Sequence, residues 1–220
     1  MSNASIKHIS VSRTARYVVI GNPQAEERWL VVHGYGQLAP RFAQKFASLA
    51  GQHRCFVVPE ALNRFYVSGF SGKVGATWMT AEDREKDIAD NVAYLDVLHL
   101  EAGFEFNAVF GFSQGVATLC RWMQHRRPEG ARAIFWAGSV AREMEQWSEQ
   151  DARFLASGSL HYVFGDNDPF FSESKINEQF AILRRLQISF DALRFEGKHV
   201  IDKGLLHQLI ASSDDIKCAK

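Results

Sequence analysis

The chain has few cysteines and no excess of either charge. Its three cysteines, Cys55, Cys120 and Cys218, are odd in number and lack the spacing of a metal site, so we expect reduced thiols and no disulfide framework. Lysine plus arginine and aspartate plus glutamate number 25 each, which gives a net charge of zero. No overall field therefore attracts nucleic acid or an anionic membrane. The sequence has no metal-binding or nucleotide-binding motif either, so we expect no metal and no cofactor.

Long apolar runs and repeats are absent as well. No run approaches the roughly 18 residues that a membrane span needs, and the N-terminus is polar. We therefore expect no secretory signal, no integral membrane association and a cytoplasmic location. With 220 residues, 46% of them hydrophobic, and no linker or low-complexity stretch, the chain is expected to form one domain over residues 1–220.

Short apolar runs bounded by polar residues predict strands that are buried on both faces. They lie at residues 29–32 and 55–58, and a central apolar run ends at Gly111. Later strands are predicted over 133–137, 160–164 and 189–195. Two further strands, at 6–12 and 15–20, are expected to form an antiparallel edge. Helices are predicted over 40–50, from an N-cap at Thr80 with a buried face of Ile88, Val92, Leu95 and Leu98, directly after Ser113, over 173–187 and over 202–211. Residues 60–79 have no regular pattern.

This alternation of strands and helices predicts the α/β class, with a mostly parallel central sheet and helices on both faces, in three layers. Ligands of such sheets bind beyond the carboxyl ends of the strands. Residues that follow a predicted strand are therefore the first candidates for a functional site.

Residues 111–115, Gly-Phe-Ser-Gln-Gly, lie between a predicted strand and a predicted helix. A Gly-x-Ser-x-Gly motif in this context is typical of a nucleophile elbow, in which the serine stands at a sharp, strained turn. Gly111 and Gly115 are small enough to let the helix fold back against the strand. The motif alone also fits an ordinary glycine-flanked turn with an N-cap serine, so its downstream partners decide between the two interpretations.

A serine hydroxyl needs a base to remove its proton, and the base is usually a histidine oriented by a carboxylate. Asp168 and His199 follow Ser113 in the chain order found in α/β-hydrolases, each in a loop after a different predicted strand. Among eight histidines, only His199 follows the last predicted strand within a short loop. Asp166 is the alternative carboxylate, and Asp168, which precedes Pro169, is preferred.

The negative oxygen of a tetrahedral intermediate needs fixed hydrogen-bond donors. The backbone N–H of Gln114, directly after the serine, is expected to supply one. The second is expected from the glycine-containing loop after the strand at 29–32, which leaves Tyr35 or Gly36 as the donor.

Four motifs together resemble the α/β-hydrolase superfamily, and within it the small carboxylesterase, phospholipase and acyl-protein thioesterase group. In chain order they are His33-Gly34-Tyr35-Gly36, Gly111-Phe112-Ser113-Gln114-Gly115, Gly165-Asp166-Asn167-Asp168 and Gly197-Lys198-His199. The resemblance implies a Ser113–His199–Asp168 triad, oxyanion donors from Tyr35 and Gln114, no cofactor, and little or no cap domain. The chain departs from the group at Val116, where a second glycine is common, and at Gln37, where an acid is common.

The prediction is therefore a serine carboxylesterase that cleaves short- to medium-chain esters through an acyl-enzyme on Ser113. An acyl thioesterase or lysophospholipase with the same triad, and a noncatalytic ligand receptor on the same fold, are open alternatives. Trp78 and Phe70, from the aromatic-rich stretch 62–79, are expected to line an acyl site. The expected partner is a small-molecule ester and not a nucleic acid, and a homodimer is left open.

Overall fold

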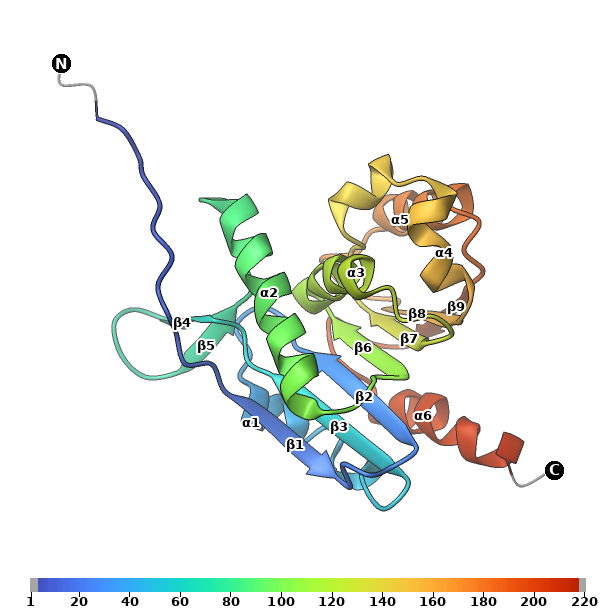
Figure 1. Ribbon diagram of the computed structural model, residues 1–220. Helices are drawn as coiled ribbons and strands as arrows, with labels where there is room; N and C mark the ends of the chain where they lie inside the picture. The colour runs from blue at the N-terminus through green and yellow to red at the C-terminus, as the bar shows by residue number, and fades with distance from the viewer. Residues whose placement is uncertain (1–3, 218–220) are drawn as a thin grey trace.

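The computed structural model describes residues 4–217, with side chains described as far as Ala211. Cys218 lies outside the described residues. A seven-stranded sheet in the order β1-β3-β2-β6-β7-β8-β9 runs through the molecule (Figure 1). Only β1 is antiparallel to its neighbour among these strands. The sheet strands are β1 (Tyr17–Gly21), β2 (Glu27–Val32), β3 (Arg54–Pro59), β6 (Ala108–Phe112), β7 (Arg132–Trp136), β8 (Ser159–Gly165) and β9 (Asp191–Phe195).

Helices cover both faces of this sheet. They are α1 (Ala39–Ala43), α2 (Arg84–Ala102), α3 (Gln114–Arg126), α4 (Glu149–Ala156), α5 (Glu173–Arg185) and α6 (Lys203–Lys217), with short 3₁₀ helices η1 (Ala47–Leu49) and η2 (Arg142–Gln146). A separate two-stranded hairpin, β4 (Asn63–Tyr66) with β5 (Val74–Thr77), projects beside the sheet (Figure 1). The α/β class and the mostly parallel three-layer sheet are thus confirmed.

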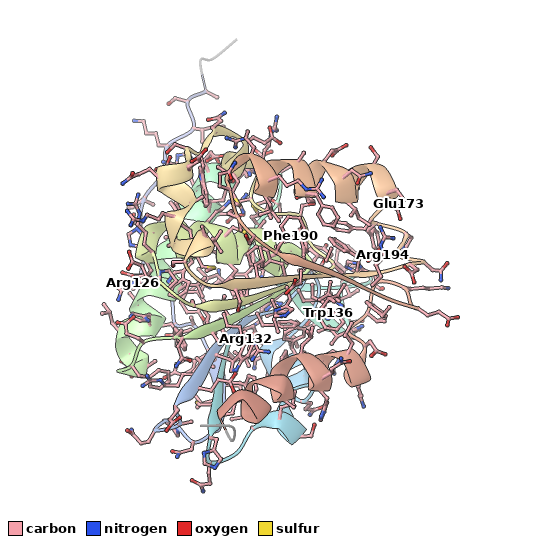
Figure 2. All side chains as sticks on the ribbon, turned by 90° about the vertical axis from the view of Figure 1, so that its right-hand side faces the viewer. Arg126, Arg132, Trp136, Glu173, Phe190 and Arg194 are labelled. Carbon is pink, nitrogen blue, oxygen red and sulfur yellow. The ribbon has the colours of Figure 1, made fainter. Side chains whose placement is uncertain are left out.

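The continuous apolar strands divide their side chains between two cores, because successive residues of a strand point to opposite faces. Leu30 and Val32 pack in the core beneath α2, α3, α4 and α5, whereas Trp29 and Val31 pack in the core beneath α1 and α6. Figure 2, which views the sheet from its β9 side, shows α5 above the strands and α6 below them. Trp136, labelled there, belongs to the core beneath α6. Burial on both faces explains why these strands read as unbroken apolar runs.

The strand predicted over residues 6–12 is wrong. These residues form an arm without regular structure that runs from β1 past α2 (Figure 1). Ile6, Ile9 and Val11 are 82%, 88% and 78% exposed. An alternating pattern alone does not make a strand, because a strand also needs a neighbour to satisfy its backbone hydrogen bonds. The second predicted edge strand does form, as β1, which pairs antiparallel with β3.

Two helix predictions also need correction. The helix predicted over 40–50 is α1 followed by the 3₁₀ turn η1, although Phe42, Phe46 and Leu49 are buried as expected. Thr80 is not an N-cap, because α2 begins three residues later, after Asp83 in the left-handed conformation (φ 48°). The Thr80 hydroxyl instead donates to the Glu82 carbonyl, at 3.2 Å.

Candidate active site

Ser113 stands at the turn between β6 and α3, with φ 53° and ψ −120°. A non-glycine residue in this region of backbone space is strained and persists only where its surroundings hold it. The Ser113 N–H donates to the Trp136 carbonyl at 2.9 Å, and the Ser113 carbonyl accepts from the Val116 N–H at 3.0 Å. The turn is therefore fixed by hydrogen bonds on both of its sides.

The two glycines of the motif are required by close packing. A Cβ atom on Gly115 would lie 2.3 Å from the Val32 carbonyl oxygen, and one on Gly111 would lie 2.9 Å from the Val116 Cα. Both contacts are with backbone, which cannot rotate away. The helix α3 thus approaches β2 and β6 closely enough to present the Ser113 hydroxyl at the carboxyl end of the sheet.

The structure brings the three residues of the predicted triad together. His199 Nε2 lies 2.9 Å from Ser113 Oγ, and His199 Nδ1 lies 2.7 Å from Asp168 Oδ2. A carboxylate at Nδ1 favours the tautomer with the proton on that nitrogen, so Nε2 accepts a hydrogen bond from the serine hydroxyl. The His199 ring also packs against two aromatic rings, with centroid distances of 5.1 Å to Phe112 and 4.9 Å to Phe170.

The two candidate carboxylates occupy different environments. The Asp168 side chain is fully buried, and its second oxygen accepts from the Phe170 N–H at 2.9 Å. Asp166 is half-exposed and lies 3.8 Å from Arg194, which is itself paired with Glu173 at the surface (Figure 2). Of these two carboxylates, Asp168 is the one hydrogen-bonded to His199.

The candidate oxyanion donors come from the loop after β2 and from the residue directly after Ser113. Within residues 4–217, the backbone N–H groups of Tyr35 and Gln114 have no hydrogen-bond acceptor. The Gly36 N–H, the alternative to Tyr35, donates to the Ala76 carbonyl at 2.8 Å. The geometry therefore favours Tyr35 over Gly36 as the donor from this loop.

Comparison with known families adds an independent observation. The sequence profile of the family described as Serine hydrolase (FSH1) matches residues 23–204, most of the chain.

The chain belongs to the FSH1 serine hydrolase family.

Solved structures agree with this FSH1 assignment at the level of the fold. The maize (Zea mays) acyl-protein thioesterase 2 superposes with a TM-score of 0.70 at 16% identity, covering 92% of this chain and 99% of that one. Esterase PE8 gives 0.68 at 20% identity, over 93% and 100% of the two chains. The Bacillus cereus carboxylesterase gives 0.65 at 18% identity, over 91% and 94%. No curated protein matches the sequence.

A buried histidine supports the loop of this serine hydrolase that carries Tyr35. His33 is fully buried, with Nδ1 2.7 Å from the Gly34 carbonyl and Nε2 accepting from the Ala61 N–H at 3.1 Å. Burial lowers the pKa of His33 to about 4, so the ring is neutral at physiological pH. The sequence placed His33 in the loop but gave no sign of this supporting role.

A buried carboxylate, which the sequence analysis also missed, supports the same region. Glu60 is 1% exposed and receives hydrogen bonds from Arg16 at 2.8 Å and Arg64 at 2.6 Å. Its other oxygen accepts from the Ala39 N–H, at the start of α1. Burial opposes the charged form, but the hydrogen bonds and charges of the two arginines outweigh it and hold the pKa of Glu60 below its usual value. Arg16 lies 44 residues before Glu60 and Arg64 lies 4 residues after it, and the sequence gave no reason to pair them with Glu60.

The structure places the two aromatic residues expected at an acyl site in opposite environments. Trp78 is 1% exposed, and its indole N–H donates to the His33 carbonyl at 2.8 Å, so it is part of the core. Phe70 is 99% exposed in the loop between β4 and β5. Three other apolar side chains in the loops of the site are exposed: Tyr35 (59%), Phe170 (60%) and Val200 (51%). Their positions within three residues of the end of β2, of Asp168 and of His199 were the available signal.

Within residues 4–217, no cluster of three histidine, cysteine, aspartate or glutamate side chains could hold a metal ion. In the same part of the chain, no helix is both long and apolar enough to cross a bilayer.

Proposed function

We propose that this FSH1 serine hydrolase is a carboxylesterase that cleaves short- to medium-chain esters through an acyl-enzyme on Ser113. The observation that carries the proposal is the continuous hydrogen-bonded series from buried Asp168 through His199 to the strained Ser113. Such a series is the arrangement that activates a serine for attack on a carbonyl.

In the first half-reaction, Ser113 Oγ attacks the ester carbonyl carbon while His199 Nε2 takes the hydroxyl proton. The carbon–oxygen bond to the leaving alcohol then breaks, and His199 returns that proton to the alcohol. Asp168 holds the ring orientation and stabilises the imidazolium. In the second half-reaction, water attacks the acyl carbon and gives its proton to His199. The acid leaves, and Ser113 regains the proton.

The negative oxygen that forms in both half-reactions would accept hydrogen bonds from the Tyr35 and Gln114 N–H groups. Their lack of an acceptor within the described chain supports this role. Removal of one such donor typically lowers kcat about 10² to 10³-fold, because the donors act where water is excluded.

Exposed apolar side chains around the serine support a neutral substrate. Tyr35 and Phe170 lie in the loops after β2 and β8, on opposite sides of β6, whose end carries Ser113. Apolar surface at a site favours burial of a hydrocarbon group by about 25 cal/mol per Å². Short to medium acyl chains are therefore the substrates proposed.

A cytoplasmic location is part of the same proposal. Cys55 and Cys120 are free and buried, and burial raises the pKa of both thiols, that of Cys120 to about 12. Unpaired thiols fit a reducing compartment.

Hydrolysis of p-nitrophenyl esters from acetyl to dodecanoyl, beside a matched thioester, tests the proposal. We expect turnover that is highest for the shorter chains and that falls at least about 10³-fold in Ser113→Ala. A higher kcat/KM for the thioester would identify a thioesterase instead. Absence of Ser113-dependent turnover in folded protein would favour the noncatalytic receptor.

A further inference from the structure

One short segment touches both sides of the proposed oxyanion hole. Residues 75–79, which we name the clamp segment, run from β5 towards α2. On the Tyr35 side, the Ala76 carbonyl accepts from the Gly36 N–H at 2.8 Å, and the Ala76 N–H donates to the Gln37 carbonyl at 3.0 Å. Ala76 thus holds the two residues directly after Tyr35 in place, Gly36 through its carbonyl and Gln37 through its N–H.

On the other side, the side chain of Gln114 is bonded to the same segment. Gln114 Oε1 accepts from the Trp78 N–H at 3.1 Å and lies 3.2 Å from the Thr77 hydroxyl. Gln114 Nε2 donates to the Met79 carbonyl at 2.8 Å. The amide therefore uses both its acceptor and its donor on three consecutive residues of the clamp segment.

The clamp segment also fits tightly against the loop that carries Tyr35. A Cβ atom on Gly75 would lie 2.5 Å from the Gly36 carbonyl oxygen and 2.7 Å from the Gly36 Cα. Further along, the Trp78 indole donates to the His33 carbonyl, in the residue that begins the same loop. Close packing and hydrogen bonds together leave the clamp segment little freedom to move relative to the loop.

We propose that the Gln114 side chain is a positioning residue that, through the clamp segment, sets the spacing between the Tyr35 and Gln114 N–H groups. This inference rests on the proposed esterase function. The two donors come from loops nearly 80 residues apart in sequence, and the clamp segment joins them by direct contacts on both sides. Misplacement of a catalytic group by about 1 Å can lower a rate about 10²-fold, so the spacing matters more for the transition state than for substrate binding.

Gln114→Met tests the inference, because methionine keeps the length of the side chain and removes its hydrogen bonds. We expect kcat for p-nitrophenyl acetate to fall about tenfold with KM changed less than about twofold. Affinity for a trifluoromethyl ketone, whose serine adduct carries the same negative oxygen, should fall by a similar factor. Gln124→Met, the same change further along α3, is the matched control and should leave all three quantities unchanged.

A second variant acts on the other side of the clamp segment. Gly75→Ala places a methyl group against the backbone of Gly36 and should also lower kcat and ketone affinity while leaving KM within about twofold. Gly51→Ala is its control, since a Cβ there meets no atom within 4 Å. If either variant fails to fold, Thr77→Val, which removes only one hydroxyl, should still lower kcat about threefold.

Three outcomes are distinguishable. Selective loss of kcat and ketone affinity supports the inference. Folded Gln114→Met with wild-type kcat and ketone affinity, or with only a lower melting temperature, overturns it and leaves the esterase proposal standing. Wild-type protein without Ser113-dependent hydrolysis overturns the proposed function, and the inference with it.

Discussion

The imidazole of His199 is held through both of its nitrogens and by aromatic rings. Asp168 at 2.7 Å and Ser113 at 2.9 Å leave the ring one productive orientation. A carboxylate on Nδ1 also selects the tautomer in which Nε2 can accept a proton. The Asp168 carboxylate therefore does more than place a negative charge near His199: it also fixes the tautomer and the orientation of the ring.

Asp168→Asn should lower kcat about 10⁴-fold, because an amide no longer selects the reactive tautomer of His199. Asp166→Asn is the matched control, since Asp166 pairs with Arg194 at the surface, and its kcat should change less than about threefold. Steady-state kinetics on one short ester checks both variants. The reverse ranking would show that the carboxylate has been assigned to the wrong residue.

The neutral state of His33 should make the protein sensitive to acid. Its pKa of about 4 in the fold lies below the value near 6.5 expected when unfolded, so the unfolded chain binds the extra proton between these pH values. The stabilisation is complete above about pH 6.5 and is lost as the pH falls towards 4. The loss is on the order of 3 kcal/mol for a shift of this size.

Urea denaturation of wild type and His33→Gln across this pH range checks the expectation. The pKa of Glu60 is also lowered in the fold, so protonation of Glu60 destabilises both proteins as well. This second loss of stability occurs at a lower pH than the loss caused by His33. The wild-type free energy of unfolding should therefore fall more steeply than that of the variant between pH 6.5 and 4. Parallel curves would mean that His33 is not the responsible group.

At the scale of elements, the contact between α3 and β2 positions the nucleophile. Gly115→Ala would place a methyl carbon 2.3 Å from the Val32 carbonyl oxygen and push the helix away from the strand. We expect about 1–3 kcal/mol of destabilisation by denaturant unfolding, with a fall in kcat as Ser113 moves. Gly51→Ala, in open space, should change neither. A Gly115→Ala variant as stable and active as wild type would contradict the close approach.

Elements buried on both faces could be predicted from sequence, because burial leaves a pattern in the strand itself. Residues 29–32 and 133–137 are unbroken apolar runs; the first lies within β2, and the second matches β7 except for Ala137, which follows the strand. The arm at 6–12 shows the limit of this reasoning, since its apolar residues find no neighbouring strand. The start of α2 shows a second limit. The sequence favoured Thr80 as the N-cap and gave no sign that Asp83 adopts a left-handed conformation before the helix.

The candidate site was predictable to the extent that each residue follows a strand. Ser113, Asp168 and His199 were found by chain order and by the loops they occupy. The supports behind them were not, because each depends on contacts between distant segments, such as Glu60 with Arg16 or Gln114 with Met79. The burial of Trp78 and the exposure of Phe70 could not be predicted for the same reason, since aromatic content does not tell core from surface.

At the scale of the molecule, one sheet edge gathers the loops that follow β2, β6, β8 and β9, which carry Tyr35, Ser113, Asp168 and His199. Parallel strands in register make this meeting possible, since their carboxyl ends lie together. A single domain over residues 1–220 and a homodimer stay predictions. Limited proteolysis checks the first, and analytical ultracentrifugation checks the second.

The central claim is that Ser113 is a nucleophile activated by its neighbours. Labelling the folded protein with a fluorophosphonate, followed by mass-spectrometric mapping of the modified peptide, tests this most directly. The account predicts one adduct per chain, on Ser113, that disappears in Ser113→Ala and forms far more slowly in His199→Ala. A folded wild-type protein that stays unlabelled, or that carries the adduct on another residue, would contradict it.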